Sequence, residues 1–73
     1  MKHSSDGWLI GFHVALATAR ECLRRADQYD DPETGYIDHE WHERMRTAAA
    51  YHRATAREYL RRHRLTLGYR RAA

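Results

Sequence analysis

The densest group of side chains that could bind a metal lies in residues 38–43, which read Asp-His-Glu-Trp-His-Glu. His39 and Glu43 are four residues apart, as are Asp38 and His42, and on a helix each pair is close enough to share a cation. Acidic residues are also common in the first turn of a helix, where they complement its dipole. We favour this second interpretation, a solvated helix start, and keep Asp38, His39, His42 and Glu43 only as weak metal candidates.

Other arrangements typical of enzymes are missing from the sequence. Di-iron carboxylate bundles use Glu-x-x-His motifs, and here no Glu is followed three residues later by a His. No Gly-rich phosphate loop or Ser nucleophile motif occurs, and Cys22 lies in an apolar stripe, where a small buried side chain is expected. The sequence therefore predicts a non-catalytic protein without a cofactor.

Charge is distributed unevenly along the chain. Residues 27–43 carry seven acidic and no basic side chains, whereas residues 44–73 carry nine Arg and one Glu, within a total net charge of +3. We favour the interpretation that these segments neutralise each other between copies of the chain. The alternative is a nucleic-acid-binding dimer, in which an arginine edge contacts phosphates and a tyrosine stacks on a base. Its residues would be Arg53, Arg57, Arg61, Arg64, Tyr69, Arg70 and Arg71.

Two amphipathic helices must position these groups. Apolar residues recur every three or four positions over about residues 7–29 and again over about 38–66. Between them, residues 30–37 contain Pro32 and Gly35, which favour a loop, and Asp38 is a candidate N-cap. Gly68 is a candidate helix end, which leaves residues 67–73 as a basic tail.

The short loop predicts an antiparallel helical hairpin, an all-α fold occupying the whole chain as one domain. Folding the chain about residues 33–34 brings Trp8 near Tyr59, Ala19 near Ala48 and Trp41 near Ala26. Two helices cannot cover both apolar stripes, so we expect a homodimeric four-helix bundle. The predicted oligomer interface consists of Trp8, Phe12, Leu16, Leu23, Trp41, Met45, His52, Tyr59 and Leu60.

Chain length also favours assembly. A domain of 73 residues has a small core, and such domains usually need disulfides, a metal or oligomerisation. The single cysteine cannot form an internal disulfide. The first residues lack the long apolar core of a signal peptide, so we expect a cytoplasmic protein with a reduced thiol. We expect a small regulator or adaptor that binds itself and another protein, with no membrane partner.

Two short stretches resemble known families. Residues 65–71, Leu-Thr-Leu-Gly-Tyr-Arg-Arg, resemble the C-terminal peptides that dock cargo into encapsulin shells, and they depart from that pattern at Tyr69. This resemblance implies a third function, as encapsulin-type cargo. Arg46 and His52 have the spacing of the Arg-x(4–6)-His motif of HEPN ribonucleases, but the chain is shorter than the usual bundle of that family.

Overall fold

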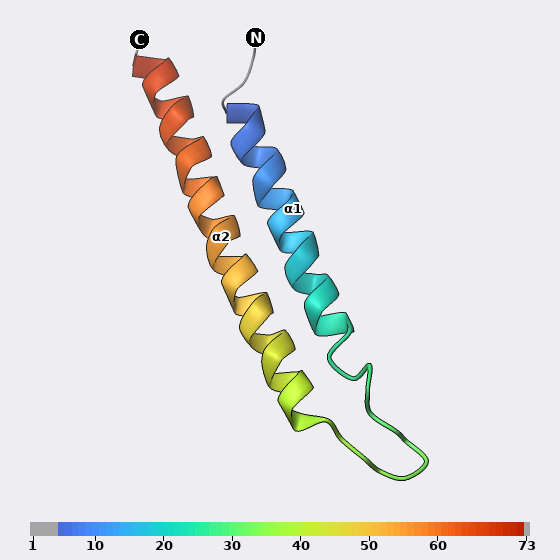
Figure 1. The fold of residues 1–73 in the computed structure, drawn as a ribbon. Coiled ribbons are helices and arrows are strands. Elements are labelled where there is room, and N and C mark those ends of the chain that lie inside the picture. The colour runs from blue at the N-terminus through green and yellow to red at the C-terminus, as the bar shows by residue number, and fades with distance from the viewer. Residues whose placement is uncertain (1–4, 73) are drawn as a thin grey trace.

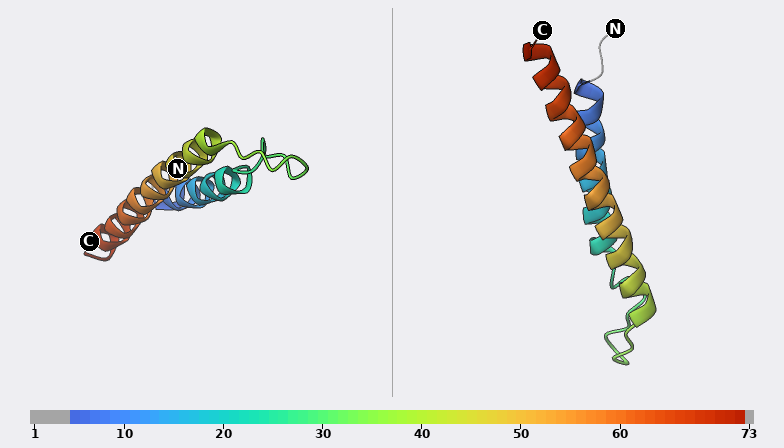
Figure 2. Two further views of the ribbon diagram at one scale, coloured as in Figure 1. Left: turned by 90° about the horizontal axis from the view of Figure 1, so that it is seen from below. Right: turned by 90° about the vertical axis from the view of Figure 1, so that its left-hand side faces the viewer.

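The structure, a computed structural model, describes residues 5–72, with side chains described for residues 7–68. Helix α1 spans Ser5–Arg24 and helix α2 spans His39–Ala72. The two helices pack side by side and run in opposite directions (Figure 1). The described residues form no strand, and the predicted all-α hairpin is confirmed. The molecule measures 63 × 18 × 12 Å and is elongated in every view (Figure 2).

The interior of the hairpin consists of small residues. Ala15, Ala19, Ala49 and Ala56 are the buried hydrophobic residues of the described part. Alanine side chains let the helix backbones approach closely, in line with the predicted register. Because an alanine buries far less apolar surface than a leucine, the two helices bury little apolar surface against each other.

Helix α1 ends at Arg24, not near residue 29 as the apolar spacing predicted. The Arg25 amide is shared between the carbonyls of Glu21 and Cys22, at 3.1 and 3.2 Å, and the next turns are tight, with Ala26 donating to Leu23. The Arg25 carbonyl then accepts the Trp41 indole N–H at 2.9 Å. The same carbonyl also accepts the Gln28 amide at 3.1 Å, so the backbone continues after α1 in tight turns.

Helix α2 starts as predicted and ends later. The Asp38 carboxylate accepts the Trp41 backbone N–H at 2.9 Å, which is an N-cap bond. The helix then continues through Gly68 to Ala72, so the predicted tail of residues 67–73 is helical as far as residue 72. Gly68 does not adopt the positive φ of a C-terminal cap; the positive-φ glycine is Gly35, at 78°.

The connection between the helices is an ordered turn. Asp31 donates its amide to the Tyr36 carbonyl at 3.0 Å, and Gly35 donates to the Asp31 carbonyl at 2.8 Å. The Asp31 carboxylate accepts the Glu33 amide at 2.9 Å, so this side chain stabilises the turn locally. The connection projects beyond the ends of both helices (Figures 1 and 2).

Candidate interaction surface

Large apolar side chains lie at the surface of the hairpin. Among the described residues no large side chain is fully buried. The residues of the predicted oligomer interface are half-buried, except Leu23, which is 43% exposed. The hairpin therefore leaves these side chains partly exposed, but it does not bring all of them to one side: Tyr59 lies against Gly11, away from Phe12, Leu16 and Leu23.

One side of the hairpin carries a row of larger apolar residues. Helical spacing places them together beside the α1–α2 contact. Gly11 and Tyr59, which touch each other, mark the opposite side. We call the row the leucine face; it consists of Leu9, Phe12, Leu16 and Leu23 of α1 and Leu60 of α2.

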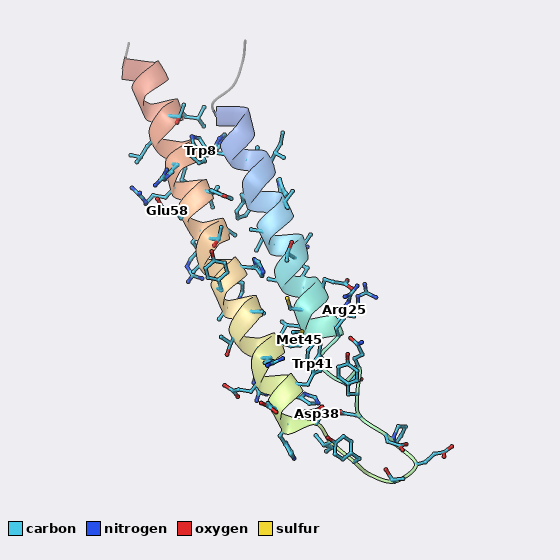
Figure 3. All side chains as sticks on the ribbon, in the orientation of Figure 1. Trp8, Arg25, Asp38, Trp41, Met45 and Glu58 are labelled. Atoms are coloured by element: carbon cyan, nitrogen blue, oxygen red, sulfur yellow. The ribbon has the colours of Figure 1, made fainter. Side chains whose placement is uncertain are left out.

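Aromatic rings close the end of the hairpin near the start of α1. The Trp8 and Tyr59 ring centroids are 5.7 Å apart, as the predicted register required. The Arg62 guanidinium lies 5.1 Å from the centre of the Trp8 ring, a cation–π contact. Gly11 permits this packing, because a Cβ atom there would lie 2.7 Å from the Tyr59 ring. Figure 3 shows Trp8 at this end and Trp41 near the opposite end.

The loop end is fixed by hydrogen bonds around Asp30. Its carboxylate accepts the Asp38 amide at 3.0 Å and lies 2.8 Å from His42 Nε2. The bond from the Asp38 amide, and next the bond from His42, hold the pKa of Asp30 below its usual value. The rings of Tyr29 and Trp41 pack edge to face beside this network, at 4.9 Å. Sequence spacing did not reveal the Asp30–His42 pair, since its members lie on opposite sides of the turn.

The weak metal candidates have other partners. Asp38 caps α2, His42 faces Asp30, and Glu43 pairs with Arg46 at 3.3 Å. His39 is exposed. Within the part of the chain that is described, no group of three or more potential ligands converges on a point.

The predicted arginine edge is exposed and only partly paired. Arg61 and Arg62 both form ion pairs with Glu58, and in each pair a guanidinium nitrogen lies 2.7 Å from Glu58 Oε2. The bonds from Arg61 and then Arg62 lower the pKa of Glu58 to about 2. Arg53, Arg57 and Arg64 have no ion pair with any described carboxylate. Tyr69, Arg70 and Arg71 belong to α2, but their side chains lie outside the described residues.

Three arginines of this edge border a groove on α2. The groove has a volume of about 540 Å³ and joins the leucine face at Leu60. We call it the basic groove; its lining residues are Arg57, Leu60, Arg61, Arg64 and Leu65. The lining combines aliphatic side chains with guanidinium groups, which suits a partner that is both apolar and acidic.

Sequence reasoning missed three exposed apolar residues. Ile10, Val14 and Tyr51 are 63%, 60% and 67% exposed. Ile10 and Val14 are four residues apart, which places them on the same side of α1, away from the leucine face. This spacing was visible in the sequence, but the stronger apolar stripe of α1 obscured it.

Comparison with known proteins identifies no relative of the chain: no family model, curated protein or solved structure matches it. Over the described residues, neither helix has the combination of length and apolar character needed to cross a membrane.

Proposed function

We propose that this protein is a non-catalytic interaction protein, a small regulator or adaptor, that works as a homodimeric four-helix bundle. The observation that carries the proposal is the interior of the hairpin, where alanines are buried and large apolar side chains are not. A leucine or phenylalanine contributes about 1.5–3 kcal/mol when it is moved from water to a fully buried position. The hairpin buries most of these side chains only in part, and a second hairpin packed on the leucine face would supply the rest of that burial.

Local roles of the ionisable side chains support a non-catalytic function. Asp38 caps a helix, Asp30 fixes the loop, and Glu58 is held by two arginines. These contacts account for the lowered pKa values of Asp30 and Glu58 without reference to a reaction. A cytoplasmic location belongs to the same proposal, and the free thiol of Cys22 is compatible with a reducing compartment.

The proposal is tested by disrupting the leucine face with a matched control. Leu16 is half-buried on this face, whereas its neighbour Ala17 is exposed on the outer side of α1. We expect Leu16→Asp to abolish the dimer and Ala17→Asp to leave it intact, as measured by light scattering behind size exclusion. Leu16→Ala, which adds no charge, should weaken the dimer and keep the helical circular dichroism signal. A dimer that tolerates both Leu16 substitutions would refute the leucine face as the interface.

Nucleic-acid binding remains the second candidate. The observation in its favour is that Arg53, Arg57 and Arg64 are exposed and have no described carboxylate partner. It predicts binding of a single-stranded oligonucleotide that weakens steeply with salt. The double variant Arg53→Glu, Arg57→Glu should lose that binding. If the wild-type protein does not bind the oligonucleotide at low salt, this function is excluded.

A further inference from the structure

We infer that the basic groove of one copy receives the acidic loop of a second copy, in an antiparallel two-fold dimer. The acidic loop is residues 27–37, with the carboxylates of Asp27, Asp30, Asp31 and Glu33 and no Lys or Arg. This inference rests on the proposed dimer and adds its orientation and its polar contacts.

The groove provides unmatched positive charge beside apolar surface. Arg57 and Arg64 stand on its rim without a described carboxylate partner, while Arg61 already bonds Glu58. Leu65 is 47% exposed in the lining. A ligand that fills the groove must therefore offer carboxylates and apolar atoms together.

The acidic loop offers both. Asp27 and Glu33 are exposed and have no ion pair among the described residues, whereas Asp30 and Asp31 are used within the loop. Next to them the loop exposes Tyr36, at 56%, and Ile37, at 48%. Its composition thus complements that of the groove in charge and in polarity.

The two surfaces cannot meet within one chain. From Ile37 to Arg61 the chain is nearly all helix, a span of about 36 Å at 1.5 Å per residue. The loop projects at one end of a molecule that is 63 Å long. A groove occupied by this loop therefore needs another molecule.

Two-fold symmetry selects the antiparallel arrangement. With the copies antiparallel, each loop lies toward the partner's basic half of α2, so the contact forms twice and the dimer closes. With the copies parallel, the two acidic loops would lie together and repel each other. Charge complementarity favours the first arrangement, and opposite charges at an interface also fix orientation.

A charge swap tests this contact. The groove variant is R57E/R64E, the loop variant is D27K/E33K, and the swap combines all four changes. Each substituted side chain is exposed and makes no described ion pair, so the substitutions spare the internal contacts. The control is R20E/R44E, which changes the charge equally at two exposed arginines outside the groove.

Dimer dissociation constants are measured by sedimentation at low and high salt. We expect the groove and loop variants each to weaken the dimer about tenfold or more at low salt, since exposed ion pairs are modest singly and four occur per dimer. The swap should restore affinity, the control should change it much less, and high salt should reduce the differences.

Other outcomes would overturn the inference. If the wild type is a dimer and the groove and loop variants have the same dissociation constant, the loop contact is refuted and the proposed dimer is not. A monomeric wild type would refute both. If R57E/R64E keeps the dimer but loses binding of a single-stranded oligonucleotide, then nucleic acid, not the loop, is the occupant of the groove.

Discussion

Gly11 gives the sharpest test of how the helices pack. Alanine normally stabilises a helix interior by about 1 kcal/mol relative to glycine. At this position, however, the new Cβ atom would lie 2.7 and 2.8 Å from two carbons of the Tyr59 ring. Carbon atoms in favourable contact are about 3.5–4.0 Å apart, so the ring or the helix must move. Overpacking of this kind costs about 1–3 kcal/mol.

Gly68 is the matched control, because it also lies in a helix and a Cβ atom there would meet no described atom within 4 Å. We expect Gly68→Ala to raise the free energy of unfolding by up to about 1 kcal/mol. The free energy of unfolding of the Gly11→Ala variant should be lower than that of the Gly68→Ala variant by about 1–3 kcal/mol, which is the overpacking cost. The assay is urea unfolding followed by circular dichroism, at one protein concentration because the stability of a dimer depends on concentration.

A double-mutant cycle identifies the cause. In a Tyr59→Ala background the ring is gone, so Gly11→Ala should become stabilising, and the two substitutions should couple by about 1–3 kcal/mol. Equal effects of Gly11→Ala and Gly68→Ala, or additivity in the cycle, would refute the close approach of α1 to Tyr59.

Three further perturbations test the loop and the charged side chains. Asp38→Ala removes the N-cap of α2 and should lower the free energy of unfolding by about 0.5–2 kcal/mol, while Glu40→Ala in the same turn serves as its control in urea unfolding. Gly35→Ala forces a non-glycine residue to φ 78° and should cost about 1–2 kcal/mol; an unchanged unfolding midpoint would contradict the left-handed turn. The pKa of Glu58 is about 2 in the folded chain against an ordinary 4.5, so its stabilisation is present above pH 4.5 and is lost as pH falls toward about 2. Glu58→Gln should flatten the decline in thermal midpoint over that window, and an identical acid profile would show that the two arginine bonds do not stabilise the fold.

Regular periodicity made most of the fold predictable. The repeats of three and four residues in both helices gave the hairpin, and the short connection gave its register, including the Trp8–Tyr59 contact. Asp38 was recognised as a cap because its position before an apolar stripe is a local signal. Each of these features depends either on residues that are close in sequence or on the pairing of positions at equal distances from the turn.

The parts that were missed depend on contacts across the chain. Helix α1 stops early where the backbone changes to tight turns, and there the Arg25 carbonyl accepts both the Gln28 amide and the Trp41 indole N–H, sixteen residues away. Helix α2 continues through Gly68, because glycine permits a helix end but does not impose one. The Asp30–His42 pair spans twelve residues of turn and helix, which no helical spacing rule covers.

The most direct measurement is the molar mass of the wild-type protein in solution, by light scattering over a range of concentrations and salt. The proposed bundle predicts a mass of two chains, twice 8.7 kDa, with dissociation only on strong dilution. A helical monomer with the mass of a single chain at every concentration would contradict the proposed bundle. The leucine face would then be exposed to solvent in the native protein.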